Sequence, residues 1–410
     1  KKYQHYNKED IINIISMIID EHRDIDEQVE ERYLNASTEE FRILVEQDFI
    51  PSKEERKKNA EIPTPVKLVD DMLHSLEKEN YFSEINPTLE PCCGKGNFVL
   101  GIFEQFYNGL EHIIDKKERC KVIIENCLYF GDLTPLNVVI TKALVLSQAG
   151  KYCGNVQDYK MNTFTGDTLN SPIQNIFNGM KFKGVISNFP YNDKSGNKGR
   201  GHQLWDKFVE RTLEYWLEED AYFLTVHPST WRQLNNKLYK PLISKQILYL
   251  EIHNVFDGQK IFKASTRYDW YLLENKQKYK NTIIKDESGK MNNINLDNWV
   301  FLPNKLYNTI KKTLSEGEDE TNRCQVFRYR STYKTENKTL VKKEKSEEYK
   351  YPLAYSINAK NEINKRYTND NTLGHFGKSK FIFSNGKGFY CDKLGEYGLT
   401  EWAFCIYDLS

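Results

Sequence analysis

The sequence predicts an α/β fold in which a parallel sheet is flanked by helices, followed by a further domain. From about residue 61 to 275, short apolar runs alternate with helical patterns, which is typical of parallel strands joined by helices. A chain of 410 residues is too long for one ordinary core. Residues 276–350 are polar, as at a linker or domain entry. We therefore expect a helical N-terminal arm over 1–60, an α/β domain over 61–280 and an α+β domain over 281–410.

Each element of this prediction follows from a local pattern. Isoleucines at helical spacing in the polar first sixty residues predict amphipathic helices. A proline at the start of a helix loses no hydrogen bond, so Thr64-Pro65 predicts the beginning of a helix over 66–76. Further helices are expected over 98–106 and 136–146, and strands over 87–90, 127–130, 185–187, 221–226, 247–253, 270–273, 381–383 and 402–404.

The composition excludes several classes of protein. Lys+Arg and Asp+Glu both total 58, so any nucleic-acid surface has to be local. No apolar run approaches the ~20 residues that span a bilayer, and no secretory signal is recognisable. The eight cysteines are scattered and lack a zinc spacing. We expect a cytoplasmic protein with reduced thiols, without a membrane segment, a metal or a disulfide framework.

The segment Asn188-Phe189-Pro190-Tyr191 follows a short apolar run that reads as a buried strand. The side-chain oxygen of Asn188 and the main-chain carbonyl of Phe189 can each accept a hydrogen from an NH2 group. Tyr191 can stack on the ring that carries this group. Pro190 restricts Phe189 to extended geometry. The pattern predicts a site that orients a planar exocyclic amine toward an electrophile.

A second pattern lies about ninety residues earlier, where a predicted strand ends in a glycine-bearing turn before a helix. Gly94 and Gly96 allow a ligand to approach the backbone, and Glu90 at the strand tip can accept from its amine or hydroxyl groups. Because the longer Gly-x-Gly-x-x-Gly pattern is missing, a dinucleotide is not expected. Asp132 ends a later strand and is the natural acceptor for ribose hydroxyls, although its distance from Gly96 implies an inserted helix.

Together these segments resemble the N6-adenine-specific DNA methyltransferases with TaqI-like, gamma-type motif order. The first segment is similar to their Asn-Pro-Pro-Tyr motif, with Phe189 in place of the first proline. Because the accepting carbonyl belongs to the main chain, this change need not abolish the chemistry. The resemblance implies a Rossmann-like domain that binds S-adenosylmethionine. The implied cofactor contacts are Thr64, Pro65, Glu90, Pro91, Cys92, Gly94, Gly96, Phe98, Asp132 and Asp167.

The resemblance also implies individual roles. Asp132 would bind the ribose and Asp167 the adenine amine of the cofactor, although any one of these acids taken alone is more often a turn or cap residue. Phe256 would supply a second aromatic ring for a flipped base, with Phe262 as the fallback; a core phenylalanine is the alternative for both. His202, His227 and His253 show no metal spacing, and we interpret them as structural.

The C-terminal part resembles the recognition region of bacterial and viral adenine methyltransferases in the segments 374–378, 381–386 and 395–404. Residues 331–380 hold eleven Lys or Arg against six Asp or Glu, which suits contacts with a DNA backbone. The implied activity is methyl transfer to the N6 amine of a flipped adenine in a specific DNA sequence, within a restriction-modification system that could include a companion nuclease. An RNA or protein-glutamine methyltransferase, or a non-catalytic DNA-binding subunit, remains as an alternative.

Overall fold

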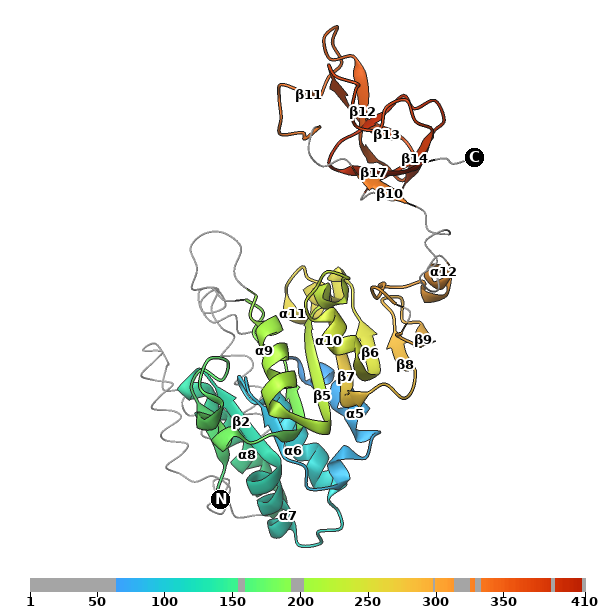
Figure 1. Cartoon of the computed structure of the whole chain (residues 1–410). Coiled ribbons are helices and arrows are strands. Elements are labelled where there is room, and N and C mark those ends of the chain that lie inside the picture. Colours follow the sequence, from blue (N-terminus) through green and yellow to red (C-terminus); the bar gives the residue numbers. More distant parts are fainter. Residues whose placement is uncertain are drawn as a thin grey trace. The chain divides into compact units, whose positions relative to one another are not determined.

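The computed structural model describes residues 64–153, 159–192, 203–297, 299–312, 325–328, 333–384 and 388–407 (Figure 1). The chain forms two compact units that divide between Thr313 and Leu314, and each unit is described by itself. The expected helical arm over 1–60 lies outside the described residues, as does His202. None of the helices in the described ranges is both long and apolar enough to cross a membrane.

The first unit is built on a nine-stranded sheet with the order β3-β2-β1-β4-β5-β7-β6-β8-β9. The five strands β1 to β5 pair in parallel, whereas β7 is antiparallel to both of its neighbours. This arrangement confirms the predicted α/β fold with a mostly parallel sheet. The strands are β1 Thr88–Glu90, β2 Leu128–Asp132, β3 Asn162–Thr165, β4 Phe182–Ser187, β5 Leu217–Pro228, β6 Lys245–Ile252, β7 Tyr268–Gln277, β8 Thr282–Lys285 and β9 Met291–Ile294.

Helices pack on the sheet through apolar faces that recur at helical spacing. The buried positions of α5 are Leu68, Val69, Met72, Leu73 and Leu76, and this helix contacts α6 and β7. The sequence separation between the glycine-bearing turn and the end of β2 predicts an inserted helix, and α7 is this helix. The helices are α5 Val66–Glu77, α6 Asn97–Gly109, α7 Lys116–Val122, α8 Pro135–Cys153, α9 Trp205–Arg211, α10 Tyr239–Ile243, α11 Val255–Phe262 and α12 Tyr307–Lys311.

The sheet continues beyond residue 280, where the sequence predicts the domain boundary. The polar composition of this region does not predict strands, but the structure contains two, β8 and β9. Alternate residues of these strands, such as Ile284 and Ile294, are buried. The segment after β9 is held to the sheet by Arg232, whose guanidinium donates to the Leu302 carbonyl at 2.7 Å and to Asn304 Oδ1 at 2.8 Å. These contacts explain why the first unit extends to residue 313.

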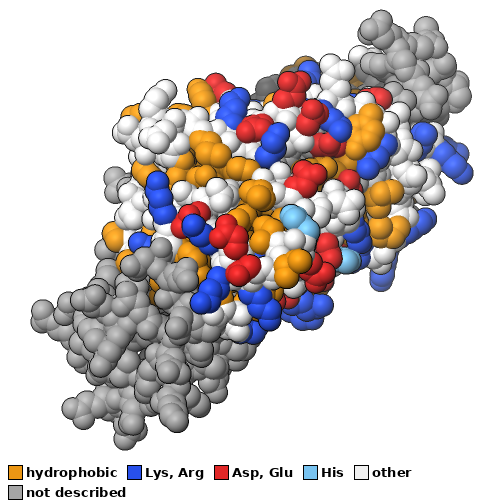
Figure 2. All heavy atoms as spheres, turned by 90° about the horizontal axis from the view of Figure 1, so that it is seen from below, with side chains coloured by type: hydrophobic (Ala, Val, Ile, Leu, Met, Phe, Trp, Pro, Cys, Tyr) orange, Lys and Arg blue, Asp and Glu red, His pale blue; other side chains and the backbone are white. Residues whose placement is uncertain are grey.

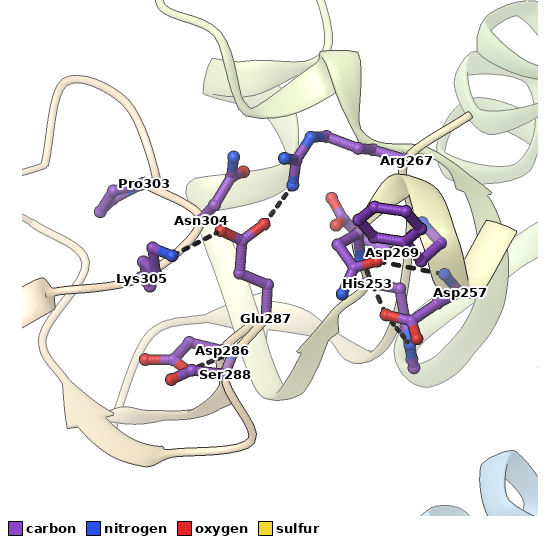
Figure 3. Close-up of polar contacts among 12 residues, drawn as sticks. His253, Asp257, Arg267, Asp269, Asp286, Glu287, Ser288, Pro303, Asn304 and Lys305 are labelled. Atoms are coloured by element: carbon purple, nitrogen blue, oxygen red, sulfur yellow. Dashed lines mark hydrogen bonds and ion pairs between the residues drawn. The ribbon is translucent and has the colours of Figure 1, made fainter. Parts of the chain in front are cut away.

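Ion pairs add to this attachment. Figure 3 shows the Glu287 carboxylate between Arg267, at the end of the loop before β7, and Lys305 in the segment after β9. Arg232 also donates from Nε to Asp269 Oδ2 at 2.7 Å, and both side chains are buried. Because the buried arginine has a carboxylate and two oxygen acceptors as partners, its charge is compensated inside the unit.

The second unit consists of two four-stranded sheets with the orders β10-β17-β14-β15 and β11-β13-β12-β16. Its described residues form strands and turns without a helix, whereas the sequence predicts an α+β domain. Apolar side chains such as Ala354, Ile382 and Cys405 fill the core. The strands are β10 Val326–Arg328, β11 Val341–Lys342, β12 Tyr351–Ile357, β13 Ile363–Thr368, β14 Lys380–Ser384, β15 Phe389–Asp392, β16 Gly398–Leu399 and β17 Ala403–Tyr407.

Candidate active site

The predicted site residues of the first unit follow strands that end at the same edge of the sheet. Glu90 is the last residue of β1, Asp132 the last of β2 and Ser187 the last of β4. The strand β1 lies between β2 and β4, so the order of the strands reverses at this point. In open α/β sheets, ligands bind outside the carboxyl ends of the strands at such a reversal. The topology therefore places the glycine-bearing turn and the segment beginning at Asn188 beside each other.

Glu90 is a buried carboxylate with one satisfied and one unsatisfied oxygen. The residue is 2% exposed. Oε1 accepts from the Cys92 backbone N–H at 3.0 Å and from the Ser187 hydroxyl at 2.7 Å. Oε2 has no hydrogen-bond partner among the described residues. Burial raises the pKa of Glu90 to about 8. A ligand that brings a donor or a positive charge to Oε2 would satisfy this group.

The turn after β1 depends on two glycines. Gly94 and Gly96 have φ values of +49° and +86°, in the left-handed region that favours glycine. A Cβ atom on Gly96 would lie 3.0 Å from Thr141 Oγ1. The backbone N–H of Gly94 donates to Asp132 Oδ2 at 2.9 Å. The turn is therefore held close to the end of β2, and a side chain at Gly96 would crowd Thr141.

Asp132 is already well supplied with donors. Besides Gly94, the Thr134 backbone N–H at 2.8 Å and Asn137 Nδ2 at 3.0 Å donate to its Oδ1. Burial nevertheless raises the pKa of Asp132, since desolvation outweighs these hydrogen bonds. The structure shows Asp132 as an organiser of the turn, and its contact with ribose hydroxyls stays a prediction.

Asp167 follows β3 and shapes the turn after it. Its Oδ1 accepts from the backbone N–H groups of Leu169 and Asn170, both at 2.9 Å, and its Oδ2 accepts from Asn170 Nδ2 at 2.8 Å. These bonds give Asp167 the turn role that the sequence leaves open. The adenine-amine contact implied by the family resemblance stays a prediction.

Asn188 joins three segments that are far apart in the sequence. Its Nδ2 donates to Thr64 Oγ1 at 2.9 Å, and the Thr64 carbonyl accepts from Asn97 Nδ2, also at 2.9 Å. The Asn188 Oδ1 atom is buried and has no hydrogen-bond partner in the described part of the chain. An amide oxygen of this kind is suited to accept a hydrogen from a bound ligand.

Phe189 explains how this chain accommodates the departure from the Asn-Pro-Pro-Tyr pattern. The residue is 1% exposed. Its ring stacks on Phe208 of α9, with centroids 5.0 Å apart and planes at 10°, and it also contacts Phe223 of β5 at 6.1 Å. The side chain thus belongs to the core below the turn, and any chemical role falls to its main-chain carbonyl.

The aromatic candidates lie in different environments. The Tyr191 ring packs edge-on against Phe262 at 6.2 Å, and Phe262 in turn packs against Tyr268 at 4.9 Å. The Tyr191 hydroxyl has no hydrogen-bond partner among the described residues, and burial raises its pKa. Phe256 is 85% exposed. The fallback Phe262 is therefore a core support for Tyr191, while Phe256 is open to contact from outside.

The remaining predicted cofactor residues support the turn or the core. The Pro91 carbonyl accepts from Thr168 Oγ1 at 3.0 Å, which ties the turn after β1 to the turn after β3. Pro65 precedes α5, as predicted, and Phe98 is buried in the core. Burial raises the pKa of the Cys92 thiol well above its usual range, so this thiol stays protonated at neutral pH.

Two side chains of this network are absent from the sequence-based site. Ser187 connects β4 to Glu90, and Asn97 connects α6 to Thr64. Ser187 is a polar residue at the end of an apolar run, which is the signal that could have identified it. Asn97 lies directly after Gly96, but its partner is 33 residues away in the sequence. Only the fold brings these groups together.

The two described histidines that the sequence analysis considers are part of the packing. His227 is buried, stacks on Trp205 at 4.4 Å and lies 3.0 Å from the Tyr271 hydroxyl. Burial lowers the pKa of His227 to about 4. His253 stacks on Tyr268 at 4.3 Å. The described residues contain no group of three or more His, Cys, Asp or Glu side chains that could hold a metal ion.

No known protein family matches the sequence, and no curated protein sequence is similar to it. Several solved structures match the fold. The ATP-dependent Type ISP restriction-modification enzyme LlaBIII, solved bound to DNA, has a TM-score of 0.50 and 13% identity, over 69% of this chain and 25% of that chain. The type I restriction-modification methyltransferase subunit from Streptococcus thermophilus has a TM-score of 0.42 and 13% identity, over 69% of this chain and 59% of that chain.

A modification subunit from Vibrio vulnificus YJ016, ascribed to a type I restriction enzyme, has a TM-score of 0.42 and 14% identity, over 61% of this chain and 53% of that chain. The chain thus spans about half the length of the Vibrio subunit and a quarter of LlaBIII. At this level of identity the similarity concerns the fold. The protein shares the α/β fold found in restriction-modification enzymes such as LlaBIII.

Proposed function

We propose that this protein transfers a methyl group from S-adenosylmethionine to the exocyclic N6 amine of an adenine that is flipped out of a specific DNA sequence. The observation that carries the proposal is the unpartnered Oδ1 of Asn188, which is buried at the end of β4 beside the glycine-bearing turn after β1 and has no partner among the described residues. The fold shared with restriction-modification enzymes supports the same class of substrate.

The residues at the ends of β1 and β2 fit the proposed cofactor. The buried Oε2 of Glu90 lacks a donor among the described residues, and the amino group of S-adenosylmethionine would provide one. Gly94 and Gly96, both at positive φ, form this turn without side chains of their own. Asp132 fixes the turn through Gly94 and can accept further hydrogen bonds, since each carboxylate oxygen has more than one lone pair. When bound, S-adenosylmethionine supplies the electrophilic methyl group.

The residues after β4 would orient the amine. Asn188 Oδ1 accepts one hydrogen of the NH2 group, and the main-chain carbonyl of Phe189 accepts the other. Two acceptors in fixed positions direct the nitrogen lone pair toward the methyl group and stabilise the positive charge that develops on the nitrogen. No side chain needs to act as a metal ligand in this scheme.

An adenine inside a duplex hides its amine in the base stack, so the base has to leave the helix before it reacts. Tyr191, three residues after Asn188, packs against Phe262, and its ring would stack on the extruded base. Phe256 is the exposed ring that would contact the base or the distorted duplex. Stacking on aromatic rings offsets part of the cost of extrusion.

We assign DNA recognition to the second unit. Lys365 is exposed on β13, and the Arg366 guanidinium next to it lies 4.1 Å from the centre of the Tyr355 ring. Cationic side chains with aromatic neighbours suit contacts with phosphates and bases. Figure 2 shows acidic and basic side chains intermixed on the described surface of one face of the molecule, so this face offers no broad basic surface to a phosphate backbone. If the protein acts in a restriction-modification system, a companion nuclease would be its partner.

The decisive experiment is methyl transfer from labelled S-adenosylmethionine to separate pools of DNA, RNA and protein. We expect label in DNA, at N6 of adenine within one sequence. Asn188→Ala should lower this transfer by a factor on the order of 100 or more, with cofactor binding retained. Label in RNA or in protein glutamine would establish one of the alternative acceptors, and DNA binding without transfer would indicate a non-catalytic subunit.

Asn275→Ala is a matched control for the Asn188 variant. Asn275 also has a buried Oδ1 without a hydrogen-bond partner among the described residues, and its Nδ2 donates to the Glu218 carbonyl at 2.7 Å. Because it lies near the far end of β7, away from the carboxyl ends of the parallel strands, its loss should leave methyl transfer within about twofold. Equal losses in the two variants would contradict the role of Asn188.

A further inference from the structure

The hydrogen bond between Thr64 and Asn188 gives Thr64 a role beyond a contact with the cofactor. We propose that Thr64 is a positioning residue: its hydroxyl oxygen holds Nδ2 of Asn188, so that Oδ1 is turned toward the amine to be methylated. This inference rests on the proposed function of Asn188. It concerns the direction of one side-chain amide, which decides whether the site presents an acceptor or a donor.

The geometry of an amide group makes this direction important. An asparagine side chain carries an acceptor on one side and two donors on the other. Nδ2 of Asn188 is 2.9 Å from Thr64 Oγ1, while Oδ1 is buried without a hydrogen-bond partner in the described residues. If the amide were reversed, its N–H groups would face the N–H groups of the amine, and neither side could accept. A hydroxyl can donate or accept, and in this structure Thr64 Oγ1 accepts from Nδ2, which leaves Oδ1 of Asn188 for the amine.

Thr64 is itself held in place, which allows it to act on Asn188. The residue is buried, and its carbonyl accepts from Nδ2 of Asn97, the first residue of α6. Pro65 follows it directly, and the Pro65 carbonyl accepts from the backbone N–H groups of Leu68 and Val69 at the start of α5. The backbone of Thr64 is therefore held by two helices, and an acceptor on a fixed backbone narrows the otherwise broad rotation of the Asn188 amide.

A positioning role and a cofactor-binding role predict different kinetics. If Thr64 orients Asn188, its hydroxyl matters in the transition state, so its removal lowers kcat and leaves KM for S-adenosylmethionine nearly unchanged. If Thr64 instead contacts the methionine end of the cofactor, as the family resemblance implies, its removal raises this KM. The two roles can be separated in one set of variants.

The test compares Thr64→Val with Thr64→Ser in the full chain. Valine keeps the branched shape without the hydroxyl, whereas serine keeps the hydroxyl. We expect Thr64→Val to lower kcat for DNA methylation about tenfold or more, with KM for S-adenosylmethionine within about twofold, and Thr64→Ser to recover most of kcat. Thr282→Val is the matched control, because this buried hydroxyl donates to the Ile247 carbonyl on β6 at 2.7 Å, far from the site in the sheet.

A kcat of Thr64→Val equal to that of the wild type, or a loss confined to KM, overturns the inference. A faster Thr64→Val variant overturns it as well, since the hydroxyl would then be blocking Oδ1. If the wild-type protein methylates none of the three pools, the proposed function fails, and the inference is decided by NMR of protein with 15N-labelled asparagine. The inference predicts that Thr64→Val shifts the side-chain amide signals of Asn188, assigned by their loss in Asn188→Ala; unchanged signals contradict it.

Discussion

Glu90 in the first unit and Asp392 in the second are both buried carboxylates, 2% exposed in each case, but their surroundings differ. Asp392 Oδ2 lies 2.7 Å from Nζ of the buried Lys380, and its oxygens also accept from the backbone N–H groups of Glu396 and Tyr397. Glu90 accepts two hydrogen bonds on Oε1, while Oε2 has no partner in the described residues.

This difference separates a group that serves the fold from one that is suited to a ligand. A buried charge is tolerated when a cation and hydrogen bonds compensate it, as Lys380 does for Asp392. Glu90 lacks such a cation among the described residues, and burial raises its pKa to about 8. A buried carboxylate oxygen without a donor or a cation costs free energy, and this supports the proposal that the cofactor's amino group binds Glu90.

The largest effect is expected where the compensated pair is broken. Lys380→Met leaves Asp392 as a buried charge without a cation, which should destabilise the second unit by about 3–5 kcal/mol. Hydrogen exchange measured by mass spectrometry on peptides from residues 351–407 of the full chain would detect the loss of protection. The double variant Lys380→Met with Asp392→Leu should recover most of the stability. Unchanged protection in the single variant would show that the pair contributes little.

Glu90→Gln tests the other member of the comparison, the buried carboxylate that lacks a cation among the described residues. The substitution removes the charge but keeps an amide that can still interact with Ser187, so the fold should persist. Affinity for S-adenosylmethionine should fall by about 1.5–3 kcal/mol, the contribution of a hydrogen bond to a charged group. Titration calorimetry would measure the change, with the exposed Glu84→Gln as control. Equal affinities of the Glu90 variant and the wild type would assign the cofactor's amino group to another partner.

The pKa of Glu90 also predicts a pH dependence of stability. The pKa is raised from 4.5 to about 8 in the folded protein. As pH rises between these values, the unfolded chain releases the proton while the folded chain keeps it, so the free energy of unfolding falls. Above about pH 8 both states are ionised and this contribution is constant. Urea unfolding from about pH 5 to 8 should show a smaller fall in Glu90→Gln; parallel curves would mean that Glu90 is ionised throughout.

The smallest effect on stability concerns an exposed ring. Phe256→Ala removes a side chain that is 85% exposed, so the free energy of unfolding should change by less than about 0.5 kcal/mol. Methylation of matched duplex DNA should nevertheless fall several-fold, and less so for an adenine opposite a mismatch, where extrusion costs less. The exposed Ile114→Ala serves as control. Equal losses on both substrates would argue against a contact with the flipped base.

Much of the first unit could be predicted from the sequence because its central strands are apolar and separated by helical patterns. The strands that escaped prediction are polar: β3 reads Asn-Thr-Phe-Thr, and β8 and β9 contain Thr, Lys and Asn. Their pairing partners in the sheet, rather than their own composition, make them strands. For the same reason the predicted boundary at residue 280 precedes the division at Thr313.

In the candidate site, the sequence predicts which groups take part but not the hydrogen bonds between them. Asn188 and Thr64 are 124 residues apart, and only the sheet order brings their segments together. The direction of the Asn188 amide and the lack of a partner for Glu90 Oε2 among the described residues are likewise properties of the folded chain. Phe256 and Phe262 show most clearly what the sequence cannot predict. The pattern around residues 254–262 does not distinguish the exposed Phe256 from the buried Phe262.

The buried ring of Phe189 changes what keeps the turn after β4 in shape. A proline restricts the backbone through its own covalent ring, and this restriction persists at any temperature. Phe189 instead depends on its stacking against Phe208, which lasts only as long as α9 remains packed on the sheet. The shape of the turn thus depends on packing in the core, so we expect heating that loosens α9 to disorganise the segment from Asn188 to Tyr191 before the chain as a whole unfolds.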